Sequence, residues 1–469
     1  MPVTINRKPI IFNPDPRRTI TRFYYKDDEK ALQVIKNVLL LTPDDVYFEL
    51  QQVLRDFSTR HRRITKVFEA NFNNIRRLFD KLDQDPDKLS IETKLLIGSY
   101  FTNEYSVEAA AYFNPSIVEH PDQYGLSEGQ KRIIVSFRAT GEGHISSLVF
   151  REGIIDRNND LRFTAPGQLD EMPEEVKRTV YNKKAFARKL DEMNIRKNIV
   201  DIVLSKLKNE FIYGELQAAI AETLKDVTLT PTKRKVIQEI NWVADSHYEI
   251  TFSLDTTISE RVIFPISYSE SNGIEDARFV RFTDDNGEVS YYATYTAYNG
   301  YTILPKLIST KDFYHFKVCP LNGKYAQNKD LALFPRKVKG KYAMVGRYDG
   351  MNNYIMFSDN INLWKEARLL QEPKFPWEFI QIGNSGSPLE TKEGWLLITH
   401  GVGPMRKYSL GAILLDPDDP GRVIGHLKYP LMVPDAKERE GYVPNVIYSC
   451  GSIIHNNELI IPYGMSDYA

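Results

Sequence analysis

The sequence predicts a mainly β fold, a five-bladed β-propeller with an N-terminal helical region and a helical insertion. The first observation behind this prediction is a recurring unit, which consists of a turn, an apolar strand and a polar residue near the end of that strand. The turn residues Gly287, Gly340 and Gly394 are 53 and 54 residues apart. Periods near 50 residues built from short strands are typical of propellers, with one blade for each unit. The second observation is that helical periodicity is confined to two stretches outside these units.

The composition is that of a folded protein with substantial cores. The 469 residues are 42% hydrophobic, enough for one large or two medium domains. The 61 basic and 62 acidic residues nearly cancel, so we expect neither nucleic acid nor an anionic membrane as a partner. Two cysteines are too few for a disulfide framework, which indicates a reducing, cytoplasmic location. The start shows no signal-peptide pattern, and no apolar run approaches the roughly 20 residues of a membrane helix.

The first part of the chain, residues 1–107, is predicted to be a helical extension. Residues 1–27 show no regular period. Val46, Leu50 and Leu54 then recur at the spacing of one helix face, and Pro43 followed by two aspartates is a typical helix start. We expect two or three helices here, which cap the propeller or form an interface in a homo-oligomer.

The propeller is predicted over residues 108–469. Alternating patterns at 132–139 and 144–151 predict strands, and helical periodicity returns over an insertion at about 170–225. From Val236 to the end we expect short strands and turns. Equivalent strand ends of different blades gather around a central channel. The polar residues expected to converge there are Arg138, Asp276, Arg278, Arg347, His400 and Asp467. Five ordinary hairpins in a β-sandwich are the alternative.

An acidic pair, Glu275 and Asp276, stands at the start of a predicted hairpin. The turn Asn286-Gly287 between two alternating runs is a strong hairpin signal. By themselves these carboxylates could belong to a solvated acidic turn. Arg138, however, follows an apolar strand and therefore needs an anionic partner. We expect Asp276 and Arg138 on opposite walls of a single pocket.

Two other kinds of chemistry find little support. The segment from Gly383 to Pro388 resembles the nucleophile loop of trypsin-like serine proteases, but the histidine context that this chemistry needs is missing upstream, so a turn is favoured. The histidines are scattered and no paired cysteine motif occurs, so we expect no metal and no organic cofactor. Taken alone, His400 could be a buried structural histidine and Lys329 an exposed turn lysine.

Several segments together resemble glycoside hydrolase family 130, in the order in which that family carries them. The resemblance covers roughly 109–165 and 236–469, and both helical regions lie outside it. The matching segments are Gly273-Ile274-Glu275-Asp276-Ala277-Arg278, residues 292–298, residues 328–335 with Lys329 and Asp330, residues 394–402 with His400, residues 408–412, Val443-Pro444-Asn445-Val446 and Tyr463-Gly464-Met465-Ser466-Asp467.

The resemblance implies an inverting β-mannoside phosphorylase, which converts a β-mannoside and inorganic phosphate to α-mannose 1-phosphate and an acceptor sugar. Phosphate is then a co-substrate. The resemblance implies Asp276 as the general acid, with its proton passing through a hydroxyl of the mannosyl unit. It also implies that Arg138 and Lys329 bind phosphate. Arg347 lies close by in this resemblance, and we expect it to complete the phosphate clamp, since cations suit an incoming anion. The residues expected to contact the sugar are Asn114, Arg278, His400 and Asp467.

Some departures from the family pattern keep alternatives open. Gly346-Arg347-Tyr348 stands where many family phosphorylases have His-Arg-Pro. One alternative is an inverting β-mannosidase, which needs a second carboxylate about 6.5–9.5 Å from the acid, with Glu142 and Glu270 as candidates. The other is a non-catalytic carbohydrate-binding propeller. The chain ends at Ala469, where members usually continue with a closing strand, so we expect either a short sequence or ring closure by the N-terminal region.

Overall fold

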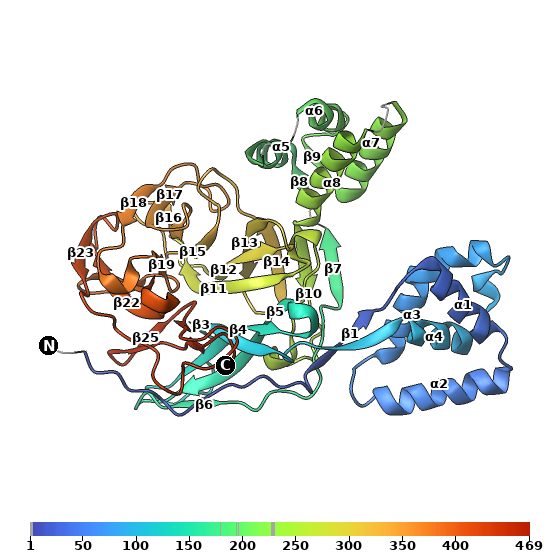
Figure 1. The fold of residues 1–469 in the computed structure, drawn as a ribbon, viewed down its shortest axis with the longest axis horizontal. Coiled ribbons are helices and arrows are strands. Elements are labelled where there is room, and N and C mark those ends of the chain that lie inside the picture. The colour runs from blue at the N-terminus through green and yellow to red at the C-terminus, as the bar shows by residue number, and fades with distance from the viewer. Residues whose placement is uncertain (1–2, 179, 194, 196, 227–229) are drawn as a thin grey trace.

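The computed structural model describes residues 3–469 except 179, 194, 196 and 227–229 (Figure 1). The β part of the chain forms four antiparallel meanders followed by two short strand pairs. The first two meanders are β3 (Ala111–Glu119), β4 (Lys131–Thr140), β5 (Ser146–Ile155) and β6 (Leu161–Phe163), and then β11 (Gly273–Thr283), β12 (Val289–Tyr298), β13 (Ile303–Thr310) and β14 (His315–Pro320). These two meanders are joined by a parallel pairing of Gly273 with Ser146.

The third and fourth meanders repeat this pattern. They are β15 (Lys329–Leu333), β16 (Tyr342–Arg347), β17 (Asn353–Ser358) and β18 (Arg368–Gln371), and then β19 (Gln381–Asn384), β21 (Gly394–Val402), β22 (Tyr408–Leu415) and β23 (Val423–His426), with β20 (Leu389–Thr391) beside β21. The final pairs are β24 (Ile447–Tyr448) with β27 (Gly464–Met465), and β25 (Ile453–His455) with β26 (Glu458–Ile460). The predicted mainly β class is confirmed.

The hairpin predicted from Asn286-Gly287 is also confirmed. Gly287 donates its backbone N–H to Asp284 across the turn at 2.8 Å. Strands β11 and β12 then pair from Thr283 and Val289 back to Gly273 and Tyr298. The acidic pair therefore lies at the end of the hairpin opposite its turn. Glu275 and Asp276 are buried within β11, so a solvated acidic turn is wrong.

The N-terminal region contains four α-helices, α1 (Asp28–Leu39), α2 (Pro43–Phe57), α3 (Ile64–Ile75) and α4 (Ile91–Tyr100). The helix start predicted at Pro43 is correct, because Thr42 caps α2 by exchanging hydrogen bonds with Asp45. The expectation that residues 1–27 are irregular is wrong in part. Strand β1 (Thr19–Phe23) pairs with β2 (Thr102–Ser106) and connects the helices to the meanders.

The helical insertion extends further than expected. It contains α5 (Lys183–Glu192), α6 (Lys197–Ser205), α7 (Tyr213–Asp226) and α8 (Pro231–Asp245), with β8 (Tyr181–Asn182) paired to β9 (Glu210–Phe211). The prediction of short strands from Val236 onwards is therefore wrong for residues 236–245, which belong to α8. Thr230 caps α8, and the buried Val236, Ile240 and Val243 share one face of that helix.

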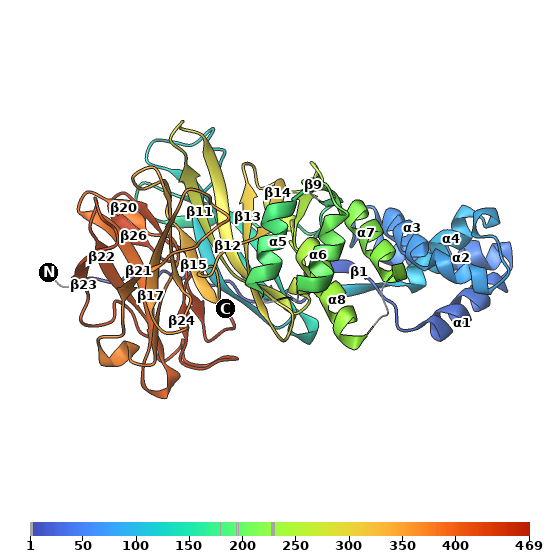
Figure 2. The same ribbon diagram turned by 90° about the horizontal axis from the view of Figure 1, so that it is seen from above.

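Both helical groups project from the β part of the molecule (Figures 1 and 2). The insertion attaches through β10 (Tyr248–Thr251), which follows α8 and pairs with both β14 and β7 (Glu175–Arg178). Among the described helices, none combines the length and the apolar character needed to cross a membrane.

Candidate active site

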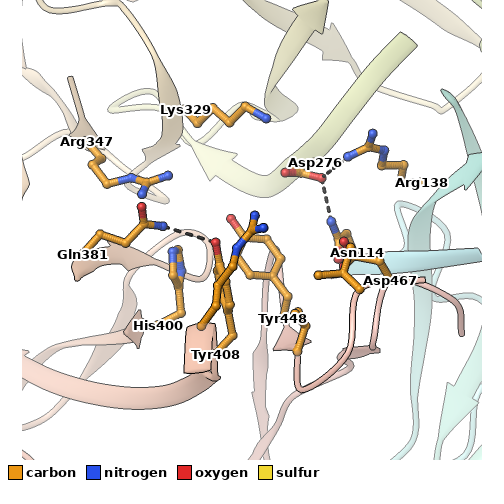
Figure 3. A pocket seen from close by; sticks show the side chains of 13 residues that line it. Asn114, Arg138, Asp276, Lys329, Arg347, Gln381, His400, Tyr408, Tyr448 and Asp467 are labelled. Carbon is orange, nitrogen blue, oxygen red and sulfur yellow. Dashed lines mark hydrogen bonds and ion pairs between the residues drawn. The ribbon is translucent and has the colours of Figure 1, made fainter. Parts of the chain in front are cut away.

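One cavity of about 160 Å³ opens where the meanders meet the C-terminal strand pairs (Figure 3). It brings together seven of the eight predicted site residues, and Arg278 is the exception. The lining residues are Asn114, Arg138, Asp276, Lys329, Arg347, Gln381, His400, Arg406, Tyr408, Val443, Val446, Tyr448 and Asp467.

Local irregularities in three strands turn polar side chains towards this region. The first strands of the first three meanders, β3, β11 and β15, each shift register near their start. Asn114, Asp276 and Asp330 lie within these shifts and have φ values of 50°, 56° and 64°. Bulges re-aim side chains, and non-glycine residues at positive φ persist only where neighbours hold them. The site is thus built from strained positions at equivalent places in successive units.

Asp276 is buried on one side of the cavity. Asn114 donates its Nδ2–H to Oδ1 of Asp276 at 2.7 Å, and Arg138 Nη1 lies 3.3 Å from the same oxygen. Burial alone would raise the pKa of Asp276, but the charges of Arg138, Lys329 and Arg278 outweigh it and hold the pKa below its ordinary value. Asp276 and Arg138 therefore share one pocket, as expected, but they touch each other on the same wall instead of facing across it.

Glu275 lies between two of the three predicted phosphate ligands, Arg138 and Lys329. Its Oε1 accepts from Arg138 at 2.7 Å, and its Oε2 accepts from Lys329 at 2.9 Å. Lys329 is also not an exposed turn residue, because it begins β15 with a half-buried side chain. A phosphate clamped directly between Arg138 and Lys329 would have to displace this carboxylate.

Asp330 is a buried carboxylate next to the cavity that contacts several side chains of the site. Sequence reasoning did not single it out. Its Oδ1 accepts from Arg278 at 2.8 Å and from the Tyr448 hydroxyl at 2.9 Å, and its Oδ2 lies 2.8 Å from Nε of Arg347. Arg278 is 2% exposed and does not line the cavity, so its expected contact with the sugar is not seen in this arrangement. The sequence did contain a signal for Asp330, because it directly follows Lys329 in one of the segments that resemble the family.

A second polar group faces Asp276 from the other side of the cavity. In Figure 3, Arg347, Gln381, His400 and Tyr408 lie together, well separated from Asp276 and Arg138. Gln381 donates to the Tyr408 hydroxyl at 3.4 Å. Tyr408 belongs to a segment quoted for the resemblance, whereas Gln381 and Arg406 lie near loops without a recognisable pattern, so sequence reasoning missed all three.

His400 is fully buried, and its Nδ1 lies 3.1 Å from the carbonyl oxygen of Asn384. Burial lowers the pKa of His400 to about 4, despite the opposing charge of Asp330, so the ring is neutral near pH 7. Its Nε2 has no hydrogen-bond partner among the described residues. This nitrogen lies 3.6 Å from Oδ2 of Asp330, the carboxylate oxygen that also holds Arg347.

Asp467 is the second carboxylate among the described lining residues. Burial and the nearby charge of Asp276 raise the pKa of Asp467 to about 6. The two carboxylates considered for a hydrolase lie elsewhere. Glu142 is exposed, and Glu270 is fully buried in a separate network where it accepts from Lys306 at 2.7 Å. Neither of them lines the cavity, so both are wrong as the partner of Asp276 across it.

Comparison with known proteins now adds to this geometry. The model of glycoside hydrolase family 130, described as beta-1,4-mannooligosaccharide phosphorylase, matches residues 242–469. A 1,2-beta-oligomannan phosphorylase of Thermoanaerobacter sp. (strain X514) is 36% identical over 208 residues, which cover 42% of this chain and 66% of that protein. A Beta-1,2-mannobiose phosphorylase of Listeria innocua is 30% identical over 48% of this chain and 61% of that protein. The chain thus spans less than two thirds of the length of these relatives.

A solved structure of Beta-1,2-Mannobiose phosphorylase from Listeria innocua, in complex with beta-1,2-mannobiose, aligns with 78% of this chain and 88% of that one, with 20% identity and a TM-score of 0.43. Fold and cavity define the chain as a mainly β protein with a cation-rich polar site. Residues 242–469 of the chain are similar to glycoside hydrolase family 130.

Proposed function

We propose that this chain is an inverting β-mannoside phosphorylase, which forms α-mannose 1-phosphate and an acceptor sugar from a β-mannoside and inorganic phosphate. One observation carries the proposal: the buried carboxylate of Asp276 faces a group of cationic and polar side chains across one cavity. The relatives named above as phosphorylases of mannosides support the substrate class.

We also infer that the four meanders and the C-terminal strand pairs are five blades of one propeller. Each unit is linked to the next, and the last to the first, by backbone pairing. The links are Gly273 with Ser146, Thr283 N–H to Pro335, Ile382 N–H to Met351, Tyr408 N–H to Asn445 and Cys450 N–H to Pro115. A cyclic series of contacts is what a closed ring of blades requires.

Phosphate is best accommodated between Lys329 and Arg347. Arg347 is held by Asp330 and Lys329 by Glu275, so both cations have fixed positions before the anion arrives. The Tyr408 hydroxyl can supply a further donor on the same side. Arg138, which the sequence assigned to this clamp, is instead engaged by both Glu275 and Asp276 and fits a role beside the acid.

The lowered pKa of Asp276 bears directly on acid catalysis. In the cavity without phosphate, Arg138 and Lys329 favour the ionised carboxylate, which cannot donate a proton. A phosphate dianion bound near Lys329 offsets this positive charge and raises the pKa of Asp276. Phosphate would then serve both as the nucleophile and as the group that makes the acid competent.

The reaction then follows from the two sides of the cavity. Protonated Asp276 supplies a proton through a mannosyl hydroxyl to the glycosidic oxygen, and the acceptor sugar leaves. Phosphate attacks the anomeric carbon from the opposite side, which inverts its configuration. The hydrogen bond from Asn114 fixes one oxygen of Asp276, and Asp467 is placed to accept from sugar hydroxyls on the same wall.

The direct test is to incubate the protein with β-1,2-mannobiose, β-1,4-mannobiose and mannosylglucose, with and without inorganic phosphate. Phosphorus NMR should detect α-mannose 1-phosphate only when phosphate is present. Release of free mannose at the same rate without phosphate would instead establish hydrolysis, with Asp467 as the carboxylate available to activate water. Binding of a mannoside without turnover of any of the three would establish the non-catalytic alternative.

A further inference from the structure

The N-terminal segment, residues 3–18, runs along the outside of the β part (Figure 1). It contacts both the last unit of the β part and the first meander. Lys8 pairs with Asp160 in the β5–β6 turn at 2.7 Å. The ring of Phe12 packs against Phe163 and Phe137, with centroid separations of 4.8 and 5.0 Å. We call this segment the strap.

Arg7, directly before Lys8, binds the last unit. The guanidinium of Arg7 makes a bidentate contact with Glu438, at 2.8 Å to Oε1 and 3.1 Å to Oε2, and also donates to the carbonyl oxygen of Val433 at 2.9 Å. The Glu438 side chain is only 4% exposed, and Tyr463 donates to it at 2.6 Å. Arg7 is therefore the cation that neutralises a nearly buried carboxylate 431 residues away.

Glu438 in turn holds the segment that carries Asp467. Its backbone carbonyl accepts from the Ser466 hydroxyl at 2.7 Å. Ser466 is fully buried, donates its N–H to Val446 at 2.8 Å and accepts from the N–H of Val443 at 3.0 Å. Ser466 and Asp467 have φ values of 48° and 51°, which such residues keep only when neighbours hold them.

This chain of contacts ends in the cavity. Val443, Val446 and Asp467 all line it, and all three depend on the hydrogen bonds around Ser466. The phosphate-side residues Lys329 and Arg347 belong to the third meander and share none of these contacts. The strap is thus connected to the sugar-facing wall, and these contacts include neither Lys329 nor Arg347.

We propose that Arg7 is a positioning residue, which acts through Glu438 and Ser466 to hold Asp467 in place for the mannosyl unit. The proposal rests on the function proposed above, in which Asp467 contacts the sugar. Removing the Arg7 guanidinium leaves the Glu438 carboxylate without its cation, and an uncompensated buried charge draws in water or moves outwards. The loop that begins at Asp435 then loosens, and the geometry at Asp467 is lost while the phosphate side is retained.

The test compares Arg7→Met, Arg7→Lys and Lys8→Met in the full chain. Lys8→Met is the matched control, because it removes a strap cation that pairs with Asp160 and not with Glu438. We expect Arg7→Met to raise the KM for the mannoside about tenfold, since a misplaced binding group readily costs this much, with the KM for phosphate within about twofold. Arg7→Lys should recover part of the loss, and Lys8→Met should match the wild type.

Equal increases in both KM values, or an effect of Lys8→Met as large as that of Arg7→Met, would overturn the proposal. Hydrogen–deuterium exchange provides a readout that needs no activity. Arg7→Met should increase exchange in 435–446 and 463–469 while 342–358 is unchanged, and this difference also shows that the variant has folded. If the wild type turns over no mannoside, the proposed function fails, and exchange alone decides the coupling. Unchanged exchange in both segments then overturns it.

Discussion

Asp276→Asn is the substitution that most directly tests the proposed chemistry. The amide is isosteric with the carboxylate and cannot donate a proton as an acid. Arg138 stays in place, because Glu275 holds it at 2.7 Å and Ser146 accepts from it at 2.8 Å. The packing cost is therefore small, and the loss should be in the chemical step. General acid catalysis contributes about 10²- to 10⁴-fold, so kcat should fall by this factor with little change in either KM.

The leaving group provides the control for this experiment. In an aryl β-mannoside with an acidic phenol, the phenolate can leave without being protonated. Asp276→Asn should therefore retain nearly full activity towards this substrate while losing activity towards mannobiose. Steady-state phosphorolysis of both substrates measures the two effects in parallel. An equal loss for both substrates would refute the assignment of Asp276 as the acid and leave it a structural carboxylate, as would retention of more than about a tenth of the activity on mannobiose.

Three further predictions concern charged groups, two of them at the cavity and one in a separate buried network. Lys329→Met should raise the KM for phosphate by about 10- to 100-fold, as expected for the loss of a charge-assisted contact, while Lys337→Met, a remote lysine paired with Asp284, should not. If phosphate raises the pKa of Asp276 as proposed, kcat at saturating phosphate should decline at a higher pH than kcat/KM for phosphate does. A decline at the same pH would contradict this mechanism. Glu270→Gln should lower the free energy of unfolding by about 3–5 kcal/mol in urea titrations at pH 7, since it leaves Lys306 buried without its carboxylate. Although burial opposes it, Lys306 lowers the pKa of Glu270 from 4.5 to about 2, so this contribution is complete above pH 4.5 and is lost as pH falls towards 2.

The sequence predicted those features that depend on local chemistry. The turn at Gly287, the helix start at Pro43 and the convergence of distant strand ends follow from residue type and spacing, and the structure contains all three. Helix α8 was missed because its paired apolar residues, such as Val236 and Ile237, also fit a short buried strand, and periodicity does not separate the two over so short a run.

The arrangement within the site could not be predicted, because register shifts break the alternation of side chains along a strand. In β11 the shift lies between Glu275 and Arg278, so a period of two does not say which carboxylate enters the cavity or that Arg278 turns away from it. For the same reason the sequence could place Arg138 and Asp276 in one pocket but not on one wall. Arg406 comes from a tight turn at a φ of 53°, a conformation that the residue type does not suggest.

Two carboxylates behind the cavity would allow it to hold several cations and still bind phosphate as proposed. Buried cations without partners would be displaced or neutralised, and Glu275 and Asp330 prevent this by each binding two of them. These carboxylates also reduce the positive charge that phosphate meets, so affinity must come from donors that are already aimed, and not from net charge alone. The same bonds transmit the effect of phosphate to the acid, because Glu275 connects Lys329 to Arg138, and Arg138 contacts Asp276. Replacing Glu275 with glutamine should therefore strengthen phosphate binding while lowering kcat, because a more positive cavity favours the ionised form of Asp276. Weaker phosphate binding in this variant would show that Glu275 acts mainly by fixing the position of Lys329.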